Sequence, residues 1–358
     1  MLPSLRAIAD RIRMRSNSVI EFDSSAGSVQ TLAMPGGLHR SEGIGYSSSG
    51  NIIAIATSDT NTVFLFRRRA DGQFETTPFW TLSGPESQLT YPHDVSFAPF
   101  GEHELLAVAQ RGGSIAIYQK GIANENYGPE PIFEICGPTS TLKYSDGVAF
   151  VPPDNDHLAA CNLETGTISF YRQTSSSPLC FDLQPVFELR HRSLADPDGL
   201  AFSRCGQWLA VANHGNHSVS IFRRRHRNVS GDKLEYGPRP VTIIKDPGLR
   251  HPHSVAFCPE TNHLVVTNSG ANYFSVYART MGVLTMGWSQ SPIAQKIVGP
   301  DALFQRVNAR NKMEGGPKGI AIHQNSLAIC SPEHGVKIYS YRFRNPEPHS
   351  PANPGTST

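Results

Sequence analysis

Short apolar runs separated by turn-forming residues recur along most of this 358-residue chain. The stretch "SDGVAFVPPDNDHLAACNLETGTISFYR", which begins at Ser145, is one example. An apolar "GVAF" is followed by a turn rich in Pro, Asp and Asn, then by a nearly continuous "LAAC", a second turn, and an alternating "TISFY". Alternation with a period of two residues between turn formers is typical of β-hairpins. The stretch therefore predicts three short antiparallel strands.

The same order of apolar runs and turns occurs six times. The six copies begin at Ser41, Pro92, Ser145, Pro197, Pro252 and Pro317. After a polar loop, five copies continue into a fourth apolar run: "FWTL" at Phe79, "IFEI" at Ile132, "VFEL" at Val186, "TII" at Thr242 and "KIV" at Lys296. A spacing of about fifty residues is what four strands joined by tight turns need.

A four-stranded sheet with two apolar faces cannot bury both of them alone. Stacking such sheets radially around an axis buries both faces and leaves only short edges. The pattern therefore predicts an all-β fold, a six-bladed β-propeller of four-stranded antiparallel blades, formed as a single domain over residues 18–344. All-β rings of this length commonly form one unit.

The ends of the chain predict how the ring closes. The last copy stops after its third run, "VKIYSYRF", and lacks a fourth. Val29–Leu32, in "SVQTLAMPGG", has the layout of the missing outer strand, so the N-terminal and C-terminal strands should share the last blade. One element is left over, because "VIEF" at Val19 resembles a third strand. A seven-bladed ring with one incomplete blade is therefore the alternative hypothesis.

Outside the repeats, residues 1–17 form a basic segment with Leu5, Ile8 and Ile12 on one helical face. We expect a short helix or a frayed end there; organellar targeting is the alternative, because the segment is rich in Arg, but it lacks the apolar core of a signal peptide. Residues 345–358 are rich in Pro and lack apolar content, so we expect a disordered tail.

Composition narrows the classes of partner and compartment. A formal net charge of +2 argues against a general nucleic-acid binder, and no apolar run approaches the length of a membrane span. The six cysteines are dispersed without a C-x-x-C pair, and Cys161 and Cys330 share one place in the repeat, where packing explains them. We therefore expect a monomer in a reducing, cytoplasmic setting.

Candidate chemistry gathers where the innermost strand of each copy begins. The equivalent position is occupied by Glu42, His93, Asp146, Asp198, His253 and Lys318. In a propeller the loops at this end surround the mouth of the central channel, and nearby loops add His214, His217, His251 and His334. A residue placed before an inner strand also pins a turn through its own side chain, and glycines beside this position indicate a tight backbone requirement. Two interpretations of these six positions therefore remain: they stabilise turns, or they form a binding site.

The repeat resembles those of the NHL and YVTN/lactonase-type propellers, and the resemblance covers the chain from Ser41 to Arg342. "SEG" at Ser41 and "PDGLAF" at Pro197 also resemble the acidic metal-ligand segments of gluconolactonase/regucalcin-type propellers, which bind a divalent ion in the channel and hydrolyse lactones. This likeness implies Glu42 and Asp198 as metal ligands. Asp146 stands nearest to where that family has asparagine ligands, so the chain departs from the family pattern there.

Two functions follow as hypotheses. The first is a ligand-binding or protein-binding platform that uses the loop-lined channel mouth, with Lys318, His214, His217, His251 and His334 as contacts. The second is a metal-dependent, lactonase-like hydrolase of a small cyclic ester, in which Glu42, Asp146 and Asp198 hold a divalent cation and His93 or His253 moves a proton. All-oxygen ligation favours calcium, and ligation by histidine favours zinc. Lys318 offers a rival way to neutralise the carboxylates. The long connection from Gly299 is a candidate lid.

Overall fold

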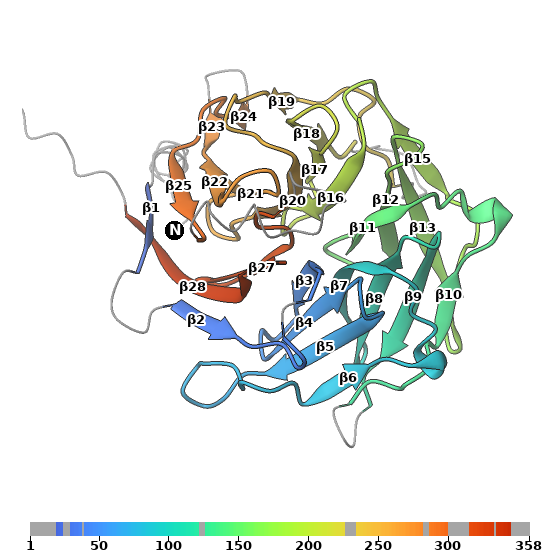
Figure 1. Ribbon diagram of the computed structural model, residues 1–358. Helices are drawn as coiled ribbons and strands as arrows, with labels where there is room; N and C mark the ends of the chain where they lie inside the picture. The colour runs from blue at the N-terminus through green and yellow to red at the C-terminus, as the bar shows by residue number, and fades with distance from the viewer. Residues whose placement is uncertain are drawn as a thin grey trace, which may run out of the picture.

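The computed structural model describes residues 19–23, 29–37, 39–121, 126–225, 234–281, 286–299, 315–332 and 334–344. These residues form six antiparallel sheets arranged as blades around a central axis (Figure 1). The innermost strands of neighbouring blades contact one another around the whole ring. The six-bladed β-propeller predicted from the repeats is confirmed.

Blades 1 to 3 each begin with the inner strand. Blade 1 consists of β3 (Ser41–Tyr46), β4 (Ile52–Thr57), β5 (Thr62–Arg67) and β6 (Trp80–Leu82). Blade 2 consists of β7 (Pro92–Phe100), β8 (His103–Gln110), β9 (Ser114–Gln119) and β10 (Phe133–Ile135). Blade 3 consists of β11 (Ser145–Phe150), β12 (His157–Asn162), β13 (Thr167–Ser176) and β15 (Phe187–Arg190), with β14 (Leu179–Phe181) paired to the far end of β13.

Blades 4 to 6 continue the ring. Blade 4 consists of β16 (Pro197–Phe202), β17 (Trp208–Asn213), β18 (Ser218–Arg223) and β19 (Thr242–Ile244). Blade 5 consists of β20 (Pro252–Phe257), β21 (Leu264–Asn268), β22 (Tyr273–Tyr277) and β25 (Ala294–Ile297), with a small hairpin of β23 (Arg279–Met281) and β24 (Met286–Trp288). Blade 6 contains β26 (Ile320–His323), β27 (Ser326–Ser331) and β28 (Gly335–Arg344). Two short 3-10 helices, η1 (Pro85–Ser87) and η2 (Pro138–Ser140), precede blades 2 and 3.

The apolar cores lie between blades. Each of six hydrophobic clusters joins side chains of two neighbouring blades, and the cluster around Ile55, Phe66 and Cys330 joins the first blade to the last. The second strand of a blade has a core on both faces, which explains its continuous apolar pattern. Cys161 and Cys330 are both fully buried in these cores, as their shared place in the repeat predicts.

The ring closes with strands from both ends of the chain. The outer strand of blade 6 is β2 (Val29–Leu32), which pairs antiparallel with β28 from Val29 opposite Tyr339 to Leu32 opposite Val336. The predicted closure is therefore confirmed. In Figure 1 the blue β1 and β2 flank the red β28 at the junction of the two ends.

The seven-blade alternative is wrong. The leftover strand β1 (Val19–Phe22) pairs with the distal half of β28, from Val19 opposite Arg344 to Phe22 opposite Tyr341. It therefore extends the outer edge of blade 6, as β14 extends blade 3. The physical reason is the length of β28, whose ten residues offer more edge than the four residues of β2 can pair.

Some predictions lie outside the described residues: the basic segment 1–17, the tail 345–358, and nearly all of the long connection after Gly299. Within the part of the chain that the structure describes, no helix is long and apolar enough to cross a membrane.

Candidate functional site

The six side chains singled out in the repeat meet at the axis. Glu42, His93, Asp146, Asp198, His253 and Lys318 are at most 3% exposed. In five blades the side chain lies where the pairing of the first and second strands changes register. Such bulges redirect a side chain out of the regular ladder. The prolines that begin several of these strands fit the same place, since a strand start does not need the missing N–H.

Glycines let the inner strands approach closely at this level. A Cβ atom on Gly43 would lie 2.5 Å from the Cα of Asp94, and one on Gly199 would lie 2.6 Å from the carbonyl oxygen of His253. Backbone sterics therefore require glycine there, and the tight backbone requirement expected from the sequence is confirmed. The polar side chains beside these glycines fill the centre of a narrow ring.

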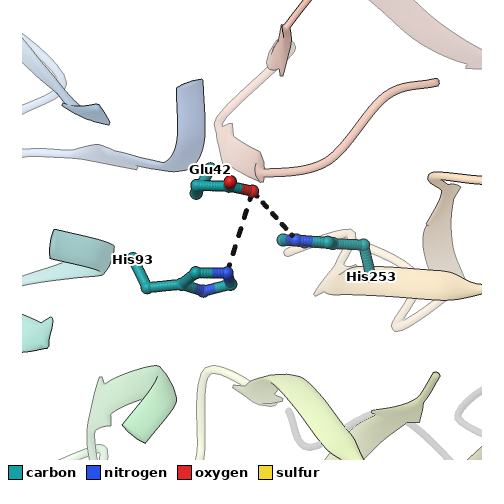
Figure 2. Close-up of side chains that lie close together, drawn as sticks. All are labelled: Glu42, His93 and His253. Carbon is teal, nitrogen blue, oxygen red and sulfur yellow. Dashed lines mark ion pairs between the residues drawn. The ribbon is translucent and has the colours of Figure 1, made fainter. Parts of the chain in front are cut away.

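Glu42 is the most heavily paired carboxylate of the ring. Its Oε2 lies 2.6 Å from Lys318 Nζ, which donates a hydrogen bond, 3.4 Å from His253 Nε2 and 3.7 Å from His93 Nε2. Its Oε1 accepts a hydrogen bond from Ser58 Oγ at 3.2 Å. Figure 2 shows the two imidazoles pointing at the same carboxylate from opposite blades. The rings of His93 and His253 stack at 5.2 Å between centroids.

Asp146 has a different cation. Arg111 donates two hydrogen bonds to it, from Nε at 2.6 Å and from Nη2 at 3.0 Å, which is the bidentate geometry that matches a guanidinium to a carboxylate. Arg111 is not among the site residues predicted from the sequence. The sequence does contain a signal for Arg111, because this residue directly follows the second strand of its copy. It therefore belongs to the loops around the channel mouth, from which only histidines were predicted.

Asp198 faces imidazoles instead of a cation. Its Oδ2 lies 3.6 Å from His253 Nε2 and its Oδ1 lies 3.9 Å from His93 Nδ1. Asp94 adds a further carboxyl group, and its Oδ2 accepts a hydrogen bond from the backbone N–H of Val148. Asp94 is not among the predicted site residues either, although its departure from the glycine found at this position in four other copies is a signal in the sequence.

These surroundings shift the pKa values in opposite directions. Burial alone would raise the pKa of Glu42, but Lys318 and the two histidines outweigh burial, and the pKa lies well below its usual value. Burial and the neighbouring Asp146 raise the pKa of Asp198 well above its usual value. Burial also raises the pKa of Asp94 to about 7. Burial lowers the pKa of His253 to about 4, and burial together with Arg111 lowers that of His93.

The ring encloses a cavity of about 10 Å³, lined by Glu42, His93, Asp94, Asp146, Asp198 and His253 together with neighbouring glycines and Ser254. This is room for about one water molecule or one bare ion. Two overlapping groups have donor atoms close enough for one ion: Glu42 with both histidines, and His93 with Asp146 and Asp198. Nε2 of His93 and both ring nitrogens of His253 lack hydrogen-bond partners among the described residues. Such orphaned buried nitrogens fit an ion, although Lys318 already binds one oxygen of Glu42.

A second layer of side chains lies above the ring at the channel mouth. Arg40 lies over the ring of Tyr91 at 5.9 Å, and Arg111 lies over Tyr91 at 5.5 Å and over Tyr144 at 5.9 Å. We call these four residues the mouth arc. Tyr91 has a φ of 57° and Tyr144 a φ of 50°, a left-handed conformation that costs energy in residues other than glycine. Tyr144 is nevertheless 52% exposed.

Three of the four predicted loop histidines come together. The ring of His251 lies 4.6 Å from that of His214 and 4.4 Å from that of His217, and the backbone N–H of His251 donates to His217 Nδ1 at 3.0 Å. His334 lies elsewhere, with its ring against Gly299, and the structure shows no contact between it and the three histidines within the described ranges. Its expected place at the mouth beside them is therefore not shown.

Comparison with known proteins shows the fold. No family model matches the sequence, and no curated protein matches it. Among solved structures, the chain is similar to the β-propeller domain of Cps50 (Swd1) from Myceliophteria thermophila, with 13% identity, a TM-score of 0.54, and coverage of 84% of this chain and 82% of that one. It is also similar to virginiamycin B lyase from Staphylococcus aureus, with 12% identity, a TM-score of 0.52 and coverage of 89% and 99%.

A proposed 6-phosphogluconolactonase from Bacteroides uniformis is similar as well, with 12% identity, a TM-score of 0.53 and coverage of 92% of this chain and 100% of that one. At such low identity these likenesses show the propeller fold alone, because one fold carries many unrelated functions. The NHL and YVTN relationship stays a resemblance of the repeats.

Proposed function

We propose that this protein is a rigid binding platform and that a protein partner docks on the face around its channel mouth. The observation that carries this proposal is the mouth arc. Arg40, Tyr91, Arg111 and Tyr144 form an alternating series of cations and aromatic rings over the ring of buried polar side chains. Arginine and tyrosine are enriched at the energetic centres of protein interfaces, because each combines a large contact area with hydrogen-bond donors.

The surroundings of the mouth arc support a protein partner over a small molecule in the channel. The cavity beneath the arc has only about 10 Å³. Beside Tyr144, an open hollow of about 400 Å³ is lined by Arg111, Lys143 and Glu164 among other residues. A peptide segment with both apolar and charged side chains would match this mixed surface. Contacts with Arg111 orient the rings of Tyr91 and Tyr144 before binding, which lowers the entropic cost of association.

The test compares two variants, each of which loses an exposed apolar or aromatic side chain. Tyr144→Ala removes part of the mouth arc, and Ile297→Ala removes a side chain that is 66% exposed on blade 5. Proteins that co-purify with the wild type and with Ile297→Ala should be lost or strongly reduced with Tyr144→Ala. Binding of each such protein is then measured with purified components. If Tyr144→Ala retains every partner at wild-type affinity, the proposal is wrong.

A second candidate function is the binding of a single metal ion in the ring. The orphaned nitrogens of His93 and His253 favour it, because their lowered pKa values leave both rings neutral and able to coordinate at pH 7. Imidazole combined with carboxylate suits zinc or another transition metal better than calcium, which prefers oxygen alone. Glu42, His93 and His253, whose donor atoms lie within 4.8 Å of one another, would hold the ion.

The hydrolase hypothesis requires that a substrate, as well as an ion, reaches this ring. A bound ion would supply polarisation of an ester carbonyl, and His93 or His253 would hold the proton that moves. A cyclic ester would have to reach the ring, where the described residues leave about 10 Å³. We therefore favour a structural ion over a catalytic one. A screen of lactones and esters with the metal-loaded protein tests this preference, and turnover that disappears in His253→Gln would reverse it.

Metal analysis of the purified protein and calorimetry with zinc and with calcium test the ion itself. Zinc should bind saturably to the wild type and to His103→Gln, whose altered ring lies on β8. His253→Gln should bind at least about tenfold more weakly, since it removes one ligand. Failure of the wild type to bind any of these ions saturably would exclude the site, and equal binding by His253→Gln would exclude its proposed ligands.

A further inference from the structure

A second hollow lies between the connection that leaves blade 3 and the outer strand of blade 4. This groove has a volume of about 790 Å³, within the range of small-molecule sites. It is lined by His191, Arg192, Ser193, Asn216, Arg239, Pro240, Ile243 and Lys245. Three of these residues are cations and none is a carboxylate.

The cations of the groove have no acidic counterpart in the described part of the chain. Arg192, Arg239 and Lys245 form no ion pair there. Nearby Arg190, by contrast, binds Glu188 at 3.0 Å. Three like charges gathered around one hollow repel one another, so an anion bound between them would relieve that repulsion.

The ring of His191, a hydrogen-bond donor in the groove, is oriented by a chain of hydrogen bonds. Ser220 Oγ donates to Ser193 Oγ at 2.8 Å, and the backbone N–H of Ser193 donates to His191 Nδ1 at 3.1 Å. Because Nδ1 of His191 accepts, the ring proton of the neutral imidazole lies on Nε2. The ring of His191 also rests edge-on against Phe222 at 6.2 Å. Burial and the two nearby arginines, Arg192 and Arg239, lower the pKa of His191, which is consistent with a positive potential in the groove.

The other lining residues indicate which further groups the ligand has. Pro240 and Ile243 contribute apolar surface beside the cations, and Asn216 is held by donating a hydrogen bond from Nδ2 to the carbonyl of Ser193. We propose that this groove binds a small organic phosphate, with the phosphate oxygens between Arg192, Arg239 and Lys245 and an apolar body over Pro240 and Ile243. Guanidinium groups bind phosphate oxygens bidentately, and no residue of the mouth arc lines this groove.

Calorimetry with ADP, sodium pyrophosphate and adenosine as probes tests the proposal on the full chain. ADP should bind saturably and more weakly at high salt, because screening weakens charge pairs. Pyrophosphate should bind less tightly than ADP, since it lacks the apolar body, and adenosine should bind least. Absence of saturable ADP binding would overturn the proposal, and pyrophosphate that binds as tightly as ADP would overturn the role of Pro240 and Ile243.

Two variants separate a specific site from general surface charge. Arg239→Gln should weaken ADP binding at least about tenfold, because it removes a charge-assisted contact. Arg190→Gln removes an equal charge from a side chain that is 63% exposed and paired with Glu188, and it should change ADP binding less than about twofold. Circular dichroism confirms that both variants are folded. Equal weakening by the two variants would overturn the proposal.

Discussion

Glu42 and Asp198 occupy the same position of the repeat, yet their carboxyl groups have opposite pKa shifts. Both are buried, and both lie near His93 and His253. Glu42 also binds Lys318, and its pKa is lowered, whereas Asp198 has no cation in direct contact among the described residues, and its pKa is raised. Equivalent backbone positions therefore acquire different chemistry from the side chains of neighbouring blades.

The largest effect should come from removing the cation of Glu42. Lys318→Met leaves the buried carboxylate of Glu42 with only the half-exposed Arg40, whose Nε lies 3.3 Å from Oε1, and should lower the free energy of unfolding by about 3 kcal/mol. Urea denaturation at pH 7 measures the loss. The double variant Lys318→Met/Glu42→Gln should recover most of it, and Lys143→Met, which alters an exposed lysine, should be nearly neutral. A loss below about 1 kcal/mol in Lys318→Met would contradict the assigned pair.

Removing the cation of Asp146 should have a smaller effect. Arg111→Met breaks a bidentate pair at the edge of the ring, where solvent reaches part of the arginine, and we expect a loss of about 2 kcal/mol. The same denaturation experiment measures it, and Arg111→Met/Asp146→Asn should be more stable than the single variant. An effect larger than that of Lys318→Met would reverse the proposed order of the two pairs.

The two carboxyl groups should also respond oppositely to pH. Because the pKa of Asp198 is raised in the folded state, its burial costs stability as pH rises from its unfolded value toward its folded value. Asp198→Asn removes this cost and should make the metal-free protein more stable than the wild type by about 1 kcal/mol at pH 7, with a smaller difference near pH 4.

For Glu42 the expected pH dependence of stability has the opposite sign. Its lowered pKa contributes stability that is present above the unfolded value and is lost as pH falls through the folded value. Glu42→Gln should therefore be destabilising at pH 7 and less so in acid. Denaturation of both variants from pH 4 to pH 8, in the presence of a chelator, checks the signs, and parallel curves for the two variants would refute the contrast.

The smallest effect on stability should come from Tyr144, the most exposed ring of the mouth arc. Tyr144→Ala removes an exposed ring from a residue of unfavourable φ and should change the free energy of unfolding by less than about 0.5 kcal/mol. A thermal melt measures this change. A loss of 2 kcal/mol or more would show that the arc stabilises the ring and would weaken its role as a partner surface.

The amino-acid pattern alone determined the architecture. Period-two alternation, turn residues and the sixfold repeat predicted six four-stranded blades, and the missing fourth run of the last copy identified Val29–Leu32 as the closing strand. Within a blade, these features depend on strands that follow one another in the chain, so a local pattern predicts them. The closing strand was predictable because the repeat shows which strand the last copy lacks. The same alignment placed one polar residue of each blade at the axis, because strands that are equivalent in a repeat are equivalent in the ring.

Only the tertiary structure decided which of those residues meet and in what state of charge. Lys318 and Glu42 are 276 residues apart in the chain, and Arg111 of blade 2 binds a carboxylate of blade 3. Three further features likewise arise between blades or between loops: the pairing of β1 with the far end of β28, the small cavity in the ring, and the grouping of His251 with His214 and His217. Electrostatic energy depends on distance and burial in three dimensions, and a repeat that sets the backbone position of a residue leaves open which side chains surround it.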